Sequence, residues 1–258
     1  MQEQLKVLNK YKALLYELVN RDIKVRYKGS VLGMLWTVLN PILTMFVMTI
    51  VFSKLFRFEI EYYPIYFFCG HILYQLMSES TTNAMHSILD NSSLIKKVYV
   101  PKYLFPVSKI MSSVVNLLFS FLAMILIMLI LRAPFKATIL LSFIPIIYVI
   151  IFSMGLGLIL STVMVFFKDM AQLYSVITLL WMYLTPLFYP VSVLKENVPI
   201  MLVVNPMYHY IQYFRDLVLY GRIPGVMENI TCIIISSVVL IIGLVLFRKK
   251  QDKFILHI

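Results

Sequence analysis

Long stretches without an ionisable side chain are the feature that most constrains how this chain can fold. Residues 29–53 contain none, and a helix needs only about 20 apolar residues to cross a bilayer. Only 14% of the 258 residues are charged, against about a quarter in soluble domains, so a water-soluble fold would lack a polar surface. The sequence therefore predicts an all-α polytopic membrane protein, with residues 1–258 forming a single transmembrane domain.

Six apolar runs are long enough to span a membrane. They cover residues 29–53, 62–85, 110–131, 137–167, 170–194 and 229–247. Pro186 and Pro190 interrupt the fifth of these runs. A further charge-free stretch, residues 198–214, is interrupted by Asn205-Pro206, and broken segments of this length are typical of short re-entrant or interfacial helices. We therefore expect six transmembrane helices, with short helices between the fifth and the sixth.

The distribution of Lys and Arg predicts the orientation. Six spans put both termini on one side of the membrane, together with sixteen of the 23 Lys and Arg residues. Cytoplasmic segments carry the excess of basic residues, so both termini are expected in the cytoplasm. The net charge of +11 is then explained by the basic residues that set the orientation in the membrane and by their attraction to anionic headgroups. We therefore expect no nucleic-acid partner.

Residues 1–28 combine a charged stripe with an apolar face. On a helix, one face would carry the charged residues Lys10, Glu17, Arg21, Lys24 and Lys28, and the opposite face would carry the apolar residues Leu8, Leu15, Val19 and Ile23. This pattern predicts an amphipathic helix that lies in the membrane interface before the first span. The residues expected to matter in this interface helix are Arg21, Lys24, Arg26, Tyr27 and Lys28.

The sequence offers no arrangement of residues for catalysis. It lacks the G-x-x-x-x-G-K-[S/T] loop that cradles nucleotide phosphates. The four His residues are scattered, and Cys69 and Cys232 lie inside apolar runs, as small buried side chains do. We expect no catalytic residue, no metal site and no cofactor in this chain, so energy for uphill transport must come from a partner or an ion gradient.

Residues 86–109 form a basic loop between the second and third spans. Asn91 is a good helix N-cap and Pro101 ends the short helix that would follow it. Leu94 and Ile95 would then have nothing in their own chain to cover them, which favours a docking partner over an ordinary positive-inside loop. The coupling residues expected here are Asn91, Leu94, Ile95, Lys96, Lys97, Tyr99 and Pro101, with Lys168 and Asp169 in the turn between the fourth and fifth spans.

Aromatic residues crowd the first, second, fourth and fifth spans. Sugars stack on aromatic rings, so a glycan channel would use such a lining, but packing and the interfacial aromatic belt explain the rings equally well. The candidate channel residues are Trp36, Tyr74, Tyr174, Trp181 and Tyr183. Glu79 joins them because a carboxylate inside an apolar run costs about 2.5 kcal/mol or more, unless it reaches water at the end of its span.

Prolines divide residues 190–225 into pieces too short to span. Such backbone is tolerated at membrane depth only where protein covers it or where it lines a cavity. We expect two short helices at the outer boundary, about residues 193–204 and 206–220, with Arg215 and Asp216 near water. They form either a seal or a gate over a channel, and the candidate gate residues are Pro186, Tyr189, Pro190, Asn205, Pro206, Tyr208 and Arg215.

Four motifs resemble those of one family. They are R-D-I-K-V-R-Y-K-G-S-V-L-G-M-L-W-T-V-L-N-P at residues 21–41, N-S-S-L-I-K-K-V-Y-V-P at 91–101, F-F-K-D at 166–169 and N-P-M-Y at 205–208. Together they resemble the permease subunits of ABC transporters that export lipid-linked polysaccharide, such as O-antigen or teichoic acid. Lys168 departs from the Arg that is usual there and loses its bidentate geometry.

This resemblance implies a homodimer in the cytoplasmic membrane of a bacterium that moves a polyprenyl-linked glycan. It also implies two copies of a separate nucleotide-binding ATPase, which would hold ATP and Mg²⁺ and dock at residues 86–109. The alternative is a channel or secondary transporter that works alone, although no inverted repeat is visible in the sequence. A membrane-embedded glycosyltransferase would need arranged carboxylates or a metal motif at a membrane face.

Overall fold

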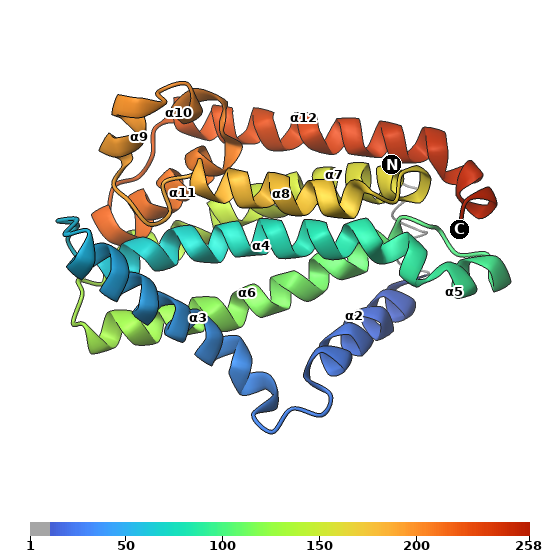
Figure 1. Ribbon diagram of the computed structural model, residues 1–258, viewed down its shortest axis with the longest axis horizontal. Helices are drawn as coiled ribbons and strands as arrows, with labels where there is room; N and C mark the ends of the chain where they lie inside the picture. The colour runs from blue at the N-terminus through green and yellow to red at the C-terminus, as the bar shows by residue number, and fades with distance from the viewer. Residues whose placement is uncertain (1–10) are drawn as a thin grey trace.

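The computed structural model describes residues 11–258, and every regular element within them is helical (Figure 1). The helices along the long axis of the molecule are α4 (Tyr63–Asp90), α6 (Leu104–Ile130), α7 (Phe143–Phe166), the shorter α8 (Met170–Tyr183) and α12 (Val226–Lys250). α5 (Ser92–Lys97) lies at one end, together with the C-terminus, and α11 (Pro206–Arg215) lies at the other. We call these the α5 end and the α11 end.

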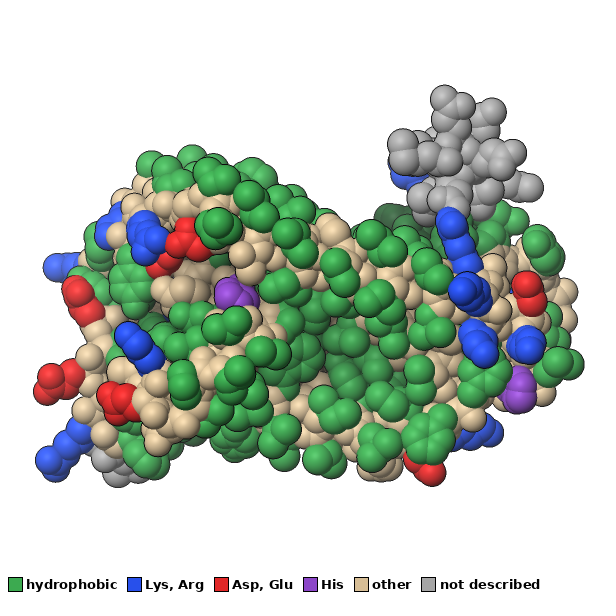
Figure 2. All heavy atoms as spheres, turned by 90° about the horizontal axis from the view of Figure 1, so that it is seen from above, with side chains coloured by type: hydrophobic (Ala, Val, Ile, Leu, Met, Phe, Trp, Pro, Cys, Tyr) green, Lys and Arg blue, Asp and Glu red, His purple; other side chains and the backbone are tan. Residues whose placement is uncertain are grey.

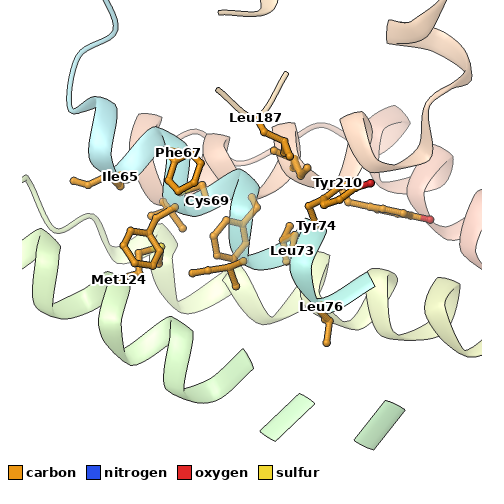
Figure 3. Close-up of a cluster of buried hydrophobic side chains, with 14 of the residues drawn as sticks. Ile65, Phe67, Cys69, Leu73, Tyr74, Leu76, Met124, Leu187 and Tyr210 are labelled. Carbon is orange, nitrogen blue, oxygen red and sulfur yellow. The ribbon is translucent and has the colours of Figure 1, made fainter. Parts of the chain in front are cut away.

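α4 is the central helix of the bundle. It packs against α6 and α7 along most of its length, and the side chains of Phe67 and Leu73 are fully buried. Figure 3 shows this cluster, in which Met124 of α6 and, from further along the chain, Leu187 and Tyr210 surround α4. Apolar burial on several sides makes α4 the element around which the other helices are arranged.

Four segments are long and apolar enough to cross a membrane, and they coincide with the first, third, fourth and sixth predicted spans. They are Gly33–Ser53, Leu104–Ile130, Ala137–Phe166 and Val226–Leu256. On the face that Figure 2 shows, the side chains of Lys, Arg, Asp and Glu gather toward the two ends and leave the middle uncharged. The chain is therefore a multi-pass membrane protein.

The second and fifth predicted spans differ from these four. α4 is 28 residues long, but it is more polar, because protein rather than lipid surrounds it; the buried hydroxyl of Thr81, for example, donates to the carbonyl oxygen of Met77 at 2.6 Å. α8 ends at Tyr183, shortly before Pro186 and Pro190, the two prolines that interrupt the fifth run. The six-span arrangement stays a prediction.

The Gly33–Ser53 segment lies at the side of the bundle. It consists of η1 (Gly33–Leu35), α3 (Trp36–Met48) and the first part of η2 (Thr49–Leu55), and it contacts mainly α6 and α4. Only 11% of its most apolar stretch is buried by the rest of the chain. Most of this helix is thus left for lipid or for another protein chain to cover.

α7 and α12 cross at two glycines with their backbones in contact. A Cβ atom on Gly155 would lie 2.5 Å from the backbone nitrogen of Leu240, and one on Gly243 would lie 2.3 Å from the carbonyl oxygen of Gly155. Small residues allow such close approach of helices within a membrane. This crossing fixes α12 against the core of the bundle.

α2 (Lys12–Tyr27) corresponds to the described part of the predicted interface helix. The predicted charged stripe is exposed at Glu17, Arg21 and Lys24, whereas Leu18 is buried against other parts of the chain. The helix therefore packs on protein with one face. Residues 1–10 and the side chain of Tyr27 lie outside the described residues.

The region before the last long helix contains several short elements. These are α9 (Val191–Asn197), α10 (Met201–Val204), α11 and the π-helical turn η4 (Asp216–Tyr220), with η3 (Ala137–Ser142) nearby and η5 (Gln251–Leu256) at the α5 end. The predicted helix over 206–220 is present as α11 followed by η4. The predicted helix over 193–204 is divided in two, because Pro199 follows the end of α9 and cannot continue its hydrogen bonding.

Candidate functional site

α5 is the predicted coupling helix, and one of its faces is already covered. Ile95 is only 7% exposed and belongs to a cluster with Leu18 of α2 and Phe254 of η5. The expectation that Ile95 is uncovered is therefore wrong, because two segments distant in the sequence fold over it. Leu94 is half-buried at the edge of the same cluster.

Asn91 links α5 to two other helices. It occupies the N-cap position of α5, but its side chain makes no capping hydrogen bond. Its Oδ1 accepts hydrogen bonds from Nη1 and Nη2 of Arg21, both at 3.2 Å, and its Nδ2 donates to the carbonyl oxygen of Ser87 at 2.8 Å. The end of α4, the start of α5 and α2 thus meet at this one residue.

The opposite side of α5 is open to solvent. Lys96 and Lys97 are exposed, Val98 is 51% exposed and Tyr99 is 95% exposed. Pro101 follows and precedes α6. Exposed apolar and aromatic side chains beside two cations form a surface suited to a partner, and we call residues 96–99 the α5 surface.

The turn between α7 and α8 lies at the same end of the molecule (Figure 1). Lys168 and Asp169 are both exposed, and the backbone carbonyl of Asp169 accepts the first hydrogen bonds of α8, from Gln172 and Leu173. No ion pair joins Lys168 to Asp169 among those of the described residues. Both side chains are therefore available at the α5 end.

Glu79 is the carboxylate expected to be costly inside a span, and α2 neutralises it. Its Oε1 lies 2.7 Å from Nη2 of Arg26 and accepts hydrogen bonds from Asn116 at 2.8 Å and Ser113 at 3.2 Å. A charge at membrane depth is tolerated when it is paired in this way. No local pattern identifies this partner, because Arg26 lies 53 positions before Glu79 in the sequence.

Two of the candidate channel tyrosines are buried between helices. The hydroxyl of Tyr74 donates to the carbonyl oxygen of Thr178, and that of Tyr174 lies 2.6 Å from Oγ1 of Thr81. Tyr74 is 5% and Tyr174 is 3% exposed. Their geometry favours the packing explanation over a channel lining within one chain.

The remaining aromatic candidates differ in exposure. Trp181 is half-buried and its Nε1 donates to Oδ1 of Asn205 at 2.8 Å. Trp36 and Tyr183 are exposed, at 43% and 58%. Of the six candidates, these two thus offer the most open surface to a passing substrate.

Arg215 is buried at the α11 end, and the expectation that it stays near water is wrong. Its guanidinium donates to the carbonyl oxygens of Tyr66, Pro186 and Leu187 at 2.8–3.3 Å, and lies 3.5 Å from the centre of the Tyr66 ring. Gly70 makes room for it, since a Cβ there would lie 3.0 Å from Nη2. Asp216 is buried as well, at 6% exposure.

The other gate candidates are joined to the same region. Oδ1 of Asn205 accepts from the backbone N–H of Met207 and so caps α11, of which Pro206 is the first residue. Tyr189 donates its hydroxyl to the carbonyl oxygen of Tyr183 at 2.6 Å. Pro190 and Tyr208 border a cavity at this end. Within the described residues no group of three or more His, Cys, Asp or Glu could hold a metal ion.

Comparison with known proteins assigns the chain to a family. Residues 13–219 match the model of the ABC-2 type transporter family. The chain is 31% identical over 247 residues to the "O-antigen export system permease protein RfbA" of Klebsiella pneumoniae, covering 93% of each chain, and 30% identical over 250 residues to a protein of the same name from Myxococcus xanthus, covering 96% of each. The "Polysialic acid transport protein KpsM" of Escherichia coli is 24% identical over 240 residues. This chain therefore belongs to the ABC-2 type transporter family, as a permease similar to those of O-antigen export.

Proposed function

We propose that this chain is the transmembrane subunit of an ABC exporter that moves a lipid-linked polysaccharide across the cytoplasmic membrane of a bacterium. The observation that carries the proposal is the likeness to O-antigen export permeases, which extends over 93% or more of the chain. The α5 end is the cytoplasmic end in this proposal. The cargo is a glycan on a polyprenyl carrier, and both termini lie in the cytoplasm.

A separate ATPase subunit docks on the α5 surface. The exposed ring of Tyr99 and the side chain of Val98 supply apolar contacts, and Lys96 and Lys97 supply charge for an acidic partner. The ATPase holds ATP and Mg²⁺. The turn between α7 and α8, which contains Lys168 and Asp169, lies at the same end (Figure 1) and forms the edge of the contact.

α4 supplies a direct mechanical link from this surface to the other end of the molecule. Its 28 residues, at about 1.5 Å each, make a rod of about 42 Å. Asn91 follows its last residue, and the Tyr66 carbonyl near its first turn accepts hydrogen bonds from Arg215. A tilt of α5 on ATP binding would therefore displace α11 and the gate residues around it.

Two copies of the chain enclose the path of the glycan. α8 contacts α4 and α7 on a narrow face, and its other side exposes large apolar residues such as Val176 and Leu180, at 65% and 61%. A second copy is the proposed cover for this side of α8, with Trp36 and Tyr183 available to sugars. A continuous passage suits a polymer longer than the membrane is thick.

The test is co-purification of the ATPase with variants of the α5 surface. Val98→Asp and Tyr99→Asp should abolish ATPase binding and glycan export while leaving the permease in the membrane, because both side chains are exposed. Leu256→Asp is the matched control, since Leu256 is 79% exposed on η5 at the same end. Normal binding and export by the Tyr99→Asp variant would place the docking site elsewhere.

A further inference from the structure

A cavity of about 660 Å³ opens at the α11 end, within the range of about 300–1,000 Å³ that is usual for small-ligand sites. Its wall is built from five separate parts of the chain: residues 59–61, which precede α4, Tyr66 of α4, residues 190–191, the segment of α11 and η4, and residues 222–232. Pro190 and Tyr208 are two of the predicted gate residues. The cavity therefore adjoins the segment proposed as the gate.

Tyrosine rings form the flat parts of this wall. Tyr208 is half-buried and Tyr220 is 50% exposed, so both rings have surface open to a ligand. Tyr66 also lines the cavity, but it is buried, and the guanidinium of Arg215 covers its ring without lining the cavity itself. Flat aromatic faces bind the C–H faces of sugar rings, and phenol hydroxyls bind their oxygens.

A buried carboxylate stands beside these rings. Asp216 is 6% exposed, and its Oδ1 accepts a hydrogen bond from Nε2 of Gln212 at 3.0 Å. Both side chains line the cavity. A carboxylate and an amide held next to each other offer acceptors and donors to adjacent hydroxyl groups, as a sugar presents them.

The charge of the cavity is negative. Its lining includes four carboxylates, those of Glu59, Glu61, Asp216 and Glu228, against the guanidinium of Arg222. The guanidinium of Arg215 lies just behind, on the Tyr66 ring, so four carboxylates face two cations. Arg222 is already paired with Glu228 at 2.7 Å. A bound anion would thus meet like charges that are only partly compensated, and such repulsion is an effective means of rejecting a ligand.

We propose that this cavity binds sugar residues of the exported glycan as they leave the passage, and that it selects uncharged or amino sugars over anionic ones. Tyr208 and Tyr220 stack on the sugar ring, and Asp216 with Gln212 binds its hydroxyl or ammonium groups. This inference rests on the proposed function and deepens it by naming the class of sugar. The cargo would then differ in charge from polysialic acid, the anionic polymer named in "Polysialic acid transport protein KpsM" of Escherichia coli, which is 24% identical to this chain.

Three sugars test the selection: glucose, glucosamine, which differs from glucose by an ammonium group at C2, and glucuronic acid, which differs from it by a carboxylate at C6. Their affinities for the purified full-length protein in lipid nanodiscs can be measured by saturation-transfer NMR titration. We expect the first two to bind and glucuronic acid to bind at least about tenfold more weakly, the equivalent of about one interaction between unit charges at close range. The Asp216→Asn variant should lower the affinity for glucosamine about tenfold. The ratio of the affinities for glucosamine and for glucuronic acid should therefore become smaller.

The control variant is Glu196→Gln, which removes an exposed carboxylate of α9 that does not line the cavity and should change nothing. Tyr208→Ala gives a second test if Asp216→Asn fails to fold, and it should weaken all binding. Absence of sugar binding, or equal binding of the three sugars, would overturn the inference. Glycan export by the same wild-type protein would leave the proposed function standing in each of those cases.

Discussion

At the α11 end the buried guanidinium of Arg215 binds backbone carbonyls of α4 and of residues 186–187, whereas at the α5 end α2 is attached through ion pairs whose side chains are only partly buried. In the pair of Arg26 and Glu79 the two side chains are 34% and 22% exposed. Buried charged hydrogen bonds are costly to break, while exposed pairs contribute little. The α11 segment is thus expected to move together with α4, and α2 to separate from the bundle more easily.

The largest effect should come from removing the guanidinium at the α11 end. Arg215→Met leaves three carbonyl oxygens without their donor and should destabilise the fold by about 3 kcal/mol or more. Arg222→Met is the matched control, because Arg222 is exposed and pairs with an exposed carboxylate. The fraction of protein that stays monodisperse in detergent after heating measures the difference. Equal losses for the two variants would contradict the contrast between the two ends.

A smaller effect at the same end should follow from crowding the guanidinium. In Gly70→Ala the new Cβ would lie 3.0 Å from Nη2 of Arg215 and 3.0 Å from Cδ2 of Leu187. We expect a loss of about 1–3 kcal/mol, measured by the same heating assay. If Arg215→Met and Gly70→Ala act through one contact, their combined effect will be less than the sum of the two.

At the α5 end, removing an ion pair should reduce stability less than removing Arg215 does at the α11 end, and the loss should depend more on salt concentration. Glu79→Gln removes the ion pair with Arg26 and should lower the free energy of unfolding by about 1 kcal/mol. The variant should also let α2 separate from the bundle, so disulfide cross-linking between a cysteine introduced at Val19 and one introduced at an exposed site on α6 should become less efficient. Glu17→Gln, in the exposed stripe of α2, is the control. An undiminished cross-link in the Glu79→Gln variant would show that the apolar contacts of Leu18 alone hold α2.

The smallest effect is expected for Asp22→Asn, which weakens the 3.0 Å contact with Lys109. Asp22 also contacts the neighbouring Arg21, at 3.3 Å. The loss should be less than about 1 kcal/mol, because Asn keeps an Oδ1 that can accept from both cations. High salt should reduce it only in part, since the side chains of Lys109 and Asp22 are only 18% and 13% exposed. A larger loss that persists at high salt would mean that this pair, rather than Arg26 and Glu79, holds α2.

These contrasts also mark the limit of what the sequence could tell. Charge-free runs predicted four of the long helices, and Asn205-Pro206 predicted where α11 begins. Both features depend on residues that are close together in the sequence. The burial of Arg215 and Ile95 was missed. Both depend on segments far away in the chain, and near Arg215 the adjacent Asp216 favoured a solvated site.

The pairing of Glu79 was missed for the same reason, although a signal existed. An acid within an apolar run needs a partner, and Arg26 was the last arginine before the first span. For the tyrosines, the sequence suggested a shared role that the structure does not support. Tyr74 and Tyr183 look equally suited to a channel in the sequence, and only the packing of α4 against α8 distinguishes the buried ring from the exposed one.

The most direct test of the account is translocation in proteoliposomes that contain this chain and its ATPase, with a polyprenyl-linked glycan in the membrane. Protection of the glycan from an added glycosidase reports its passage into the vesicle. We predict that protection requires both the ATPase and ATP, that it is lost in the Tyr99→Asp variant, and that the chain alone hydrolyses no ATP. Protection by this chain without the ATPase, or protection driven by an ion gradient, would contradict the account.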